Sequence, residues 1–309
     1  MRYIALGDLV VDCYYINVNE KKELLKIDGG SSRFNVIANL AARGNKTAVI
    51  SACGDNLLGN IAIHSLMRVG VDTSNIFKYG KKTRAYHLIV EGDRHISIKT
   101  CPICGTRTWY EDAIANTEYC IRKVRPTDIL ILDGLKSENI PYLTQTSNRK
   151  VLDIGRIKRL ENLSNREILK AVKNNNVQIL QLNETVEQYL LKRFFVNTMQ
   201  DIFRLFKPEL LIITRGKRGA DILTQNNIFH KELLHFQKET DDTGAGDAFF
   251  SMFIQEYYNS DKNVNKKWVD STFILANRLT SQVVSKLGAR GHLYDDYYLK
   301  DINNCICNN

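Results

Sequence analysis

Short apolar runs alternate with helical patterns along most of the chain, and this alternation limits the folds that are available. Helical patterns are expected near residues 34–43, 58–69, 161–174, 186–206, 247–258 and 267–286. Strands that alternate with helices favour a mostly parallel sheet with helices on both faces, and ligands then bind at the carboxyl ends of the strands. Six runs have the length and composition of buried strands: Tyr3–Leu6, Thr47–Ser51, Asp128–Leu132, Lys150–Ile154, Val177–Leu182 and Leu210–Thr214.

Two segments break the alternation and are predicted to form antiparallel strands outside the main sheet. The first covers residues 13–27 and the second residues 84–99. In the second, Ala85–Val90 and His95–Lys99 flank the turn-forming residues 91–94, which is typical of a hairpin. We therefore expect one domain over residues 1–309, with a small β-sheet lid inserted from about 13–27 and 84–99.

Composition narrows the class of protein further. The chain has 309 residues, 44% hydrophobic and 25% charged, which is typical of a soluble globular protein with a large core. No apolar run approaches the ~18 residues of a membrane span, and Asp8 and Asp12 interrupt the N-terminal apolar stretch, so we expect a cytoplasmic protein. The net charge of +9 is scattered and lacks interleaved aromatic residues, which favours a solvated surface or an anionic small ligand over nucleic acid.

The segment Asp241–Phe249 contains two glycines and an alanine directly before a helical pattern. Small residues at a helix N-terminus leave backbone N–H groups accessible, and such a place binds phosphate. Asp247 lies in the first turn, where a carboxylate could accept a hydroxyl proton beside the anion. The alternative is a plain small-residue loop that Asp caps. The helix is predicted from an apolar stripe: Phe250, Phe253, Ile254 and Tyr257.

The residues Asp242–Asp247 read DTGAGD, and this string resembles the signature of the ribokinase-like (PfkB) carbohydrate kinases. The resemblance implies a three-layer α/β/α fold with a mostly parallel central sheet and a β-sheet lid. It also implies that Asp247 is the catalytic base and that the amides of Gly244, Ala245 and Gly246 form the anion hole. ATP and Mg²⁺ are the cofactors it implies.

A second segment that resembles the family, residues 29–35, lies on the side where the substrate is expected. Glycines next to a carboxylate and an amide suit a polyhydroxylated ligand, although a simple N-cap and turn would look the same locally. The resemblance implies that Asp12, Gly29, Gly30 and Asn35 bind the substrate. Counted from Gly29, the spacing to Asn35 is one residue longer than in most members, so Gly30 and Ser31 are an alternative equivalent pair.

The expected nucleotide side departs from the family pattern at one position. Asn183 matches the asparagine of an Asn-x-x-Glu motif, but the glutamate position is occupied by Val186, with Glu184 and Glu187 on either side. Either glutamate could support Mg²⁺ through water, or the magnesium shell is altered. Asp242 and the backbone near Gly288 correspond to a monovalent cation (K⁺) site. The remaining nucleotide-binding residues that the resemblance implies are Thr214, Gly216, Gly219, Asn277 and Gly288.

Cys101-Pro-Ile-Cys104-Gly is a zinc-knuckle sequence that the resemblance does not explain. A closed Zn²⁺ site would need two further ligands. The alternative is a reduced CxxC turn beside the lid. The odd total of seven cysteines argues against a secreted disulfide framework. Candidates for the missing ligands are Cys305, Cys307, Cys120 and His95.

These observations lead to three functional hypotheses. The first is an ATP-dependent kinase of a sugar or sugar-like alcohol, and the second is a nucleoside kinase of the same fold. The third is a non-catalytic, zinc-containing regulator or nucleic-acid binder, which the intact Asp247 motif and the scattered charge oppose. A homodimer formed through the lid is a further expectation, with no nucleic-acid or membrane partner.

Overall fold

The computed structural model describes residues 1–19, 21–80, 83–91, 94–109, 115–135, 139–173, 175–234, 239–260 and 263–294. The chain divides into two compact units. Unit 1 comprises Met1–Ile4, Thr117–His235 and Phe249–Arg278, and unit 2 comprises Ala5–Asn116, Phe236–Ala248 and Leu279–Asn309. That residues 1–309 behave as one kinase domain stays a prediction. None of the described helices has the length and apolar composition needed to cross a membrane.

Unit 1 is built on a mostly parallel sheet with the strand order β13-β12-β11-β10-β9-β8, and the first residues of β1 (Arg2–Asp8) extend this order beyond β8. Strands β8 to β11 are parallel, whereas β12 and β13 are antiparallel additions. Every residue of β8 is buried, which is the apolar pattern of a strand covered on both faces. The strands are β8 (Asp128–Asp133), β9 (Arg149–Ile154), β10 (Val177–Asn183), β11 (Leu210–Thr214), β12 (Ala220–Leu223) and β13 (Ile228–Lys231).

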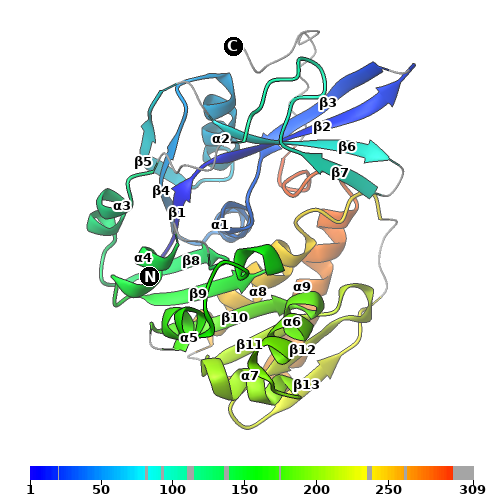
Figure 1. The fold of residues 1–309 in the computed structure, drawn as a ribbon. Helices are drawn as coiled ribbons and strands as arrows, with labels where there is room; N and C mark the ends of the chain where they lie inside the picture. The colour runs from blue at the N-terminus through cyan, green and yellow to red at the C-terminus, as the bar shows by residue number, and fades with distance from the viewer. Residues whose placement is uncertain are drawn as a thin grey trace. The chain divides into compact units, whose positions relative to one another are not determined.

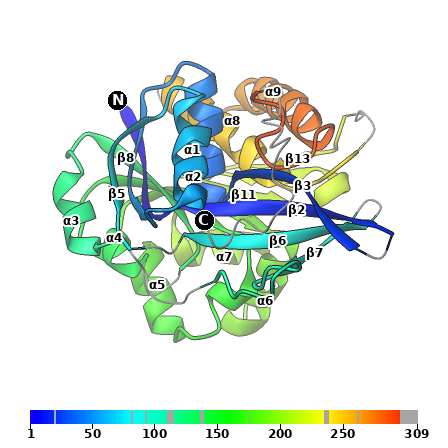
Figure 2. The same cartoon turned by 90° about the horizontal axis from the view of Figure 1, so that it is seen from above.

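Helices cover both faces of the strands in unit 1. Helices α3 to α7 lie on one face, and α8 and α9 lie on the other (Figure 1, Figure 2). On the second face, the ring of Tyr258 in α8 packs edge-on against Tyr3 in β1, with centroids 6.0 Å apart. The helices are α3 (Thr117–Lys123), α4 (Ile140–Thr144), α5 (Asn165–Lys173), α6 (Glu184–Phe194), α7 (Met199–Phe206), α8 (Ala245–Asn259) and α9 (Lys266–Val284), with short 3₁₀ turns at Ile157–Arg159 and Gly216–Arg218.

The single helix predicted over residues 186–206 is wrong, because two helices occupy this stretch. Helix α6 ends at Phe195, which adopts a left-handed φ of 53°. Helix α7 then starts with a capping box, in which Thr198 and Asp201 exchange side-chain and backbone hydrogen bonds. The prediction failed because the apolar periodicity of the sequence continues through the break. The Thr-x-x-Asp pattern at residues 198–201 is the signal that a new helix starts.

Unit 2 contains the rest of β1, followed in the sheet order by β4 (Thr47–Cys53) and β5 (Asp72–Lys78). Helix α1 (Ser32–Ala42) is closed by Arg43 and followed by Gly44, which has a φ of +80°. Helix α2 (Leu57–Met67) is capped by Asn56, whose side chain accepts the Gly59 N–H at 3.0 Å. The predicted strand at 47–51 and the helices near 34–43 and 58–69 are thus confirmed within two residues.

A separate four-stranded sheet in unit 2 confirms the predicted lid strands (Figure 2). Its order is β3-β2-β6-β7, formed by β2 (Val10–Val18), β3 (Lys21–Gly29), β6 (Arg84–Glu91) and β7 (Arg94–Ile98). The pairs β2/β3 and β6/β7 are antiparallel, and β2 pairs with β6 in parallel. Gly92 and Asp93 of the predicted hairpin turn lie outside the described residues.

Candidate active site

Helix α8 begins at Ala245, so the DTGAGD loop lies at a helix N-terminus as predicted, with Asp247 in the first turn. Gly244 adopts a φ of +82°, and a Cβ on it would lie 2.5 Å from the Cβ of Ala289. The loop therefore needs glycine for both its conformation and its packing. The Ala245 N–H donates to the Asp242 carbonyl at 3.1 Å, so an anion at this helix start would have to share or displace that bond.

The predicted base and the predicted substrate amide lie in contact. Asn35 Nδ2 donates to Asp247 Oδ2 at 2.8 Å. Asn35 is on α1, 4% exposed, and its Oδ1 accepts from Arg290 Nε at 3.0 Å. Sequence reasoning missed Arg290, because the resemblance in the loop after α9 covered Gly288 and assigned no role to the arginine two residues later.

Asp12 and Gly30 are also brought together. A Cβ on Gly30 would lie 2.5 Å from Asp12 Oδ2, so the carboxylate rests directly on the glycine backbone. Ser31 has a φ of +75°, a region that glycine prefers. Ser31 therefore adopts a backbone conformation that is typical of glycine, and which two residues correspond to the family's Gly-Gly pair stays a prediction. Gly29 lies one residue earlier, at the end of β3.

The candidate cation site involves Asp241 as well as Asp242. Asp241 is 6% exposed; its Oδ2 accepts the Gly288 N–H at 2.8 Å and its Oδ1 accepts the Thr243 N–H at 2.9 Å. Asp242 is exposed. Among the described residues, Asp241, Asp242 and His95 form the group with metal-ligand spacing, their ligand atoms lying within 4.8 Å of one another. Hard carboxylate oxygens suit a cation, so these residues fit the implied ion better than Asp242 alone.

Tyr14 of β2 lies against this loop, since its ring contacts the position a Gly288 Cβ would take, 3.3 Å from the hydroxyl. Burial raises the pKa of Tyr14 well above its ordinary value, and the nearby carboxylates of Asp12 and Asp241 raise it further. Tyr14 therefore remains a neutral phenol beside the two acids.

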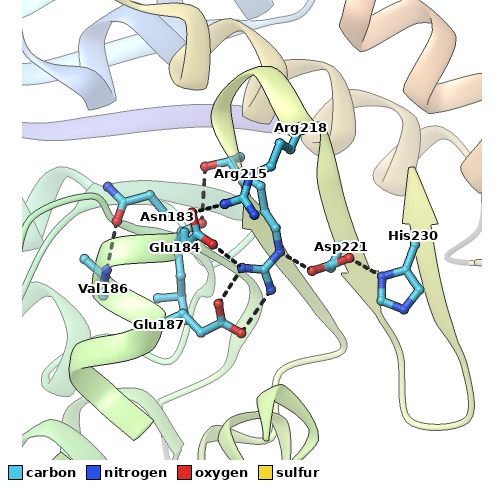
Figure 3. Close-up of polar contacts among 10 residues, drawn as sticks. Asn183, Glu184, Val186, Glu187, Arg215, Arg218, Asp221 and His230 are labelled. Carbon is cyan, nitrogen blue, oxygen red and sulfur yellow. Dashed lines mark hydrogen bonds and ion pairs between the residues drawn. The ribbon is translucent and has the colours of Figure 1, made fainter. Parts of the chain in front are cut away.

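In unit 1, Asn183 and Thr214 end adjacent parallel strands and are paired in the register of β10 and β11. The Asn183 side chain caps α6, accepting the Val186 N–H at 2.9 Å (Figure 3). It also donates to the Gly155 carbonyl at 2.7 Å. Both of its polar atoms are thus engaged by the chain itself.

Arg215 connects the carboxylates around this strand end (Figure 3). It binds both oxygens of Glu187, at 2.7 and 3.1 Å, and lies 2.5 Å from Asp221 and 3.4 Å from Glu184. The hydrogen bond to Glu187 is the main cause that raises the pKa of Arg215 above its ordinary value. Glu184 also pairs with Arg218, and this hydrogen bond lowers the pKa of Glu184.

Glu184 and Glu187 are the two candidates for the carboxylate that supports Mg²⁺, and their environments differ. Glu187 is buried and both its oxygens are held by Arg215. The side chain of Glu184 is 38% exposed and faces water as well as arginine. Glu184 is therefore the carboxylate that could orient a hydrated cation.

The other nucleotide-side residues have ordinary structural partners. The 3₁₀ turn Gly216–Arg218 closes through an Arg215 N–H bond to the Gly219 carbonyl at 2.8 Å. Asn277 on α9 is 4% exposed, donates to the Leu234 carbonyl at 3.3 Å and leaves its Oδ1 without a hydrogen bond from the described residues. Gly288 belongs to unit 2, as described above.

The zinc-knuckle cysteines occupy a tight turn in which Cys101 is buried and Cys104 is exposed. The Cys101 sulfur lies 4.0 Å from the Tyr15 hydroxyl, and the Cys104 sulfur lies 3.2 Å from Thr106 Oγ1. Within the described part of the chain, neither joins a group of metal-ligating residues, and His95 contacts Asp241 at 3.8 Å. Cys305 and Cys307 lie outside the described residues.

A helix that starts at a glycine-rich loop, on a chain with a mostly parallel sheet and a separate four-stranded sheet, is the architecture of ribokinase-like α/β kinases. A family model described as pfkB family carbohydrate kinase matches residues 2–295. The chain belongs to this family and is an ATP-dependent phosphotransferase whose acceptor is an alcohol group.

Individual relatives are distant. The chain is 23% identical over 318 residues to a fructokinase of Salmonella typhimurium, with 97% of each chain covered. A fructokinase structure from Vibrio cholerae O395, in fructose, ADP and calcium ion bound form, has a TM-score of 0.70 at 18% identity, covering 94% of this chain and 95% of that one. A nucleoside kinase structure from Methanocaldococcus jannaschii has a TM-score of 0.71 at 15% identity, covering 94% of both. These structures establish the shared fold.

Proposed function

We propose that this protein phosphorylates a hydroxyl of a sugar or sugar-like small molecule, with Asp247 as the general base and the amides of Gly244, Ala245 and Gly246 as the anion hole. The observation that carries the proposal is the 2.8 Å contact between Asn35 and Asp247 at the start of α8. It joins an amide suited to a sugar hydroxyl with a carboxylate suited to remove its proton.

Each residue of the proposed site has one task. Asp12 and Asn35 bind substrate hydroxyls, with Gly30 leaving room for the Asp12 carboxylate. Asp247 accepts the proton of the attacking hydroxyl, and the backbone N–H groups at the helix start stabilise the charge that develops on the transferred group. The small sheet excludes water from the acceptor, which limits ATP hydrolysis.

The proposed cations follow from the donor sets. Glu184 would orient hydrated Mg²⁺, which when bound neutralises phosphate charge. Asp241, Asp242 and the backbone at Gly288 would hold a monovalent cation such as K⁺, since the two carboxylates supply oxygen ligands. Zn²⁺ at Cys101 and Cys104, a cytoplasmic location and a homodimer formed through the small sheet stay predictions.

A nucleoside kinase is the second candidate, and one aromatic pair favours it. Tyr86 is paired with Asp12 between β6 and β2, so the two side chains share a face of the small sheet. The Tyr86 ring stacks on Trp109 with centroids 4.1 Å apart. An aromatic pair on the Asp12 face suits a substrate that carries a planar ring beside its sugar.

The test begins with an ADP-release screen over pentoses, hexoses, sugar phosphates and nucleosides. With the best acceptor, we expect Asp247→Asn to lower kcat by about 10²- to 10⁴-fold, because the amide cannot accept the proton. ATP affinity, measured by calorimetry, should change little.

Asp55→Asn is the matched control, since Asp55 has a side chain that is 70% exposed and lies 3.8 Å from Lys78. It should keep wild-type kcat. Turnover by Asp247→Asn within threefold of the wild type would overturn the assignment of the base. Activity on nucleosides alone would favour the second candidate.

A further inference from the structure

We infer that Arg290 is a positioning residue: it fixes the orientation of the Asn35 amide, and through it the donor that the reacting hydroxyl meets beside Asp247. The inference rests on the proposed role of Asp247. It concerns Arg290 in the loop after α9, to which the sequence patterns assigned no role.

Arg290 is 1% exposed, and its guanidinium donates hydrogen bonds to three neutral oxygens. Nε donates to Asn35 Oδ1 at 3.0 Å, Nη1 to Ser65 Oγ at 2.7 Å and Nη2 to the Gly30 carbonyl at 3.2 Å. These acceptors come from α1, from α2 and from the residue that follows β3. The planar fork thus ties three elements of unit 2 together around the Asn35 side chain.

A guanidinium has donors and no acceptor, and this decides which way the Asn35 amide points. If the amide were flipped, its NH₂ would face the Arg290 N–H, and its carbonyl would face the Asp247 carboxylate. Both contacts would be repulsive. Arg290 therefore holds the Asn35 oxygen toward itself and the NH₂ toward Asp247.

Gly29 makes room for this arrangement. A Cβ on Gly29 would lie 2.0 Å from Arg290 Nη1 and 2.2 Å from Ser65 Oγ. The two consecutive glycines thus have different tasks: Gly30 accommodates Asp12, and Gly29 accommodates the guanidinium. Gly29 was expected to contact the substrate, and the inference assigns it to the support of Asn35 instead.

The fixed amide has a consequence for the substrate. At the reacting position, Asn35 offers only N–H donors and the ionised Asp247 only acceptors. A hydroxyl fits both, because its oxygen accepts from Asn35 while its hydrogen points to Asp247. Arg290 thereby orients an oxygen lone pair away from Asp247, as attack on a phosphoryl group requires.

A double-mutant cycle tests the inference. Arg290→Met keeps most of the side-chain volume and removes every donor, and we expect kcat to fall about 10- to 100-fold, with a smaller change in the KM for ATP. Asn35→Ala should lower kcat by a similar factor. Because Arg290 acts through Asn35, the double variant should be no slower than Asn35→Ala alone. Arg290→Lys, which keeps a donor, should recover part of the loss.

Asn39→Ala is the matched control for stability. Asn39 is fully buried one turn after Asn35 on α1; its Nδ2 donates to the backbone carbonyl of Asn35 at 3.0 Å and its Oδ1 meets His292 Nε2 at 2.9 Å, so it contacts the helix but not the Asn35 side chain. It should lower the unfolding temperature while leaving kcat within twofold of the wild type. If Arg290→Met does not fold, Ser65→Ala replaces it in the cycle, since it removes one Arg290 acceptor away from Asp247.

Multiplicative effects of Arg290→Met and Asn35→Ala on kcat, or an unchanged kcat in Arg290→Met, would overturn the inference. The outcome for Asp247→Asn separates the two proposals. If that variant is inactive and the cycle is uncoupled, only the role of Arg290 fails. If that variant is active, the assignment of Asp247 itself fails.

Discussion

Substituting Gly244 by alanine perturbs the helix start in a way that can be worked out from the structure. The added Cβ would lie 2.5 Å from the Cβ and 2.7 Å from the Cα of Ala289. Carbon atoms in contact are normally ~3.5–4.0 Å apart, so the loop must move by about 1 Å. A shift of that size moves the amides of the proposed anion hole and is expected to lower kcat by about 100-fold, which is about 2.7 kcal/mol of transition-state stabilisation.

Gly44→Ala is a control with nearly the same backbone. Gly44 has a φ of +80°, against +82° for Gly244, and a Cβ there would have no neighbour within 4 Å. Both variants bear the cost of a left-handed residue, about 1–2 kcal/mol, reduced by about 0.4–1 kcal/mol through the lower entropy of the unfolded chain. We therefore expect Gly44→Ala to lose about 1 kcal/mol of unfolding free energy while keeping wild-type kcat.

The assay is steady-state ADP release at saturating ATP, combined with urea unfolding of the same preparations. The ratio of kcat between the two alanine variants isolates the effect of the clash from the effect of φ. A Gly244→Ala enzyme with kcat within twofold of Gly44→Ala would refute the reasoning, because the loop could then move by about 1 Å without affecting the reaction.

Two further predictions concern ionisable groups. Glu184→Gln should raise the Mg²⁺ concentration for half-maximal activity several-fold, whereas Glu187→Gln should leave that concentration unchanged. Glu187→Gln should instead lower the unfolding free energy in urea by about 2 kcal/mol, a limited loss because Arg215 keeps Asp221 as a partner. The opposite pattern would assign Mg²⁺ to Glu187. Burial, with smaller effects of Arg43 and Lys26, lowers the pKa of His292 to about 4. The unfolded chain, with a pKa of about 6.5, takes up this proton first, so the unfolding free energy should fall by about 3 kcal/mol between pH 6.5 and 4. His292→Gln should remove that share of the slope, and equal slopes in both proteins would contradict it.

The parts of the fold that follow from local patterns could be predicted from the sequence. The apolar run at 47–51 and the stripe after Asp247 lie in β4 and α8, because a strand buried on both faces and an amphipathic helix each leave a period in the sequence. The glycine-rich loop could be located for the same reason, since positive φ and close backbone approach demand small residues. The small sheet was also predicted, because its residues interrupt the alternation.

What could not be predicted depends on contacts between distant segments. Arg290 meets Asn35 across 255 positions, and an arginine in a loop has no period to reveal its burial. Arg215 could not be predicted for the same reason. It binds Glu187 across 28 positions, and Glu187 is one of the two glutamates between which the motif could not decide. The stack of Tyr86 on Trp109 was likewise missed, since an aromatic pair for a planar substrate was not evident from either residue's neighbours in the chain.

The two arginines that organise the candidate residues differ in how their charge is balanced. Arg215 contacts three carboxylates, so its positive charge is compensated by direct ion pairs. Arg290 binds neutral oxygens, and no described carboxylate forms an ion pair with it. Burying a guanidinium in this way is costly unless a negative charge is near. Asp247 supplies one through the Asn35 amide, which accepts from the arginine and donates to the carboxylate. The guanidinium and the carboxylate polarise the amide in the same direction, which strengthens both of its hydrogen bonds.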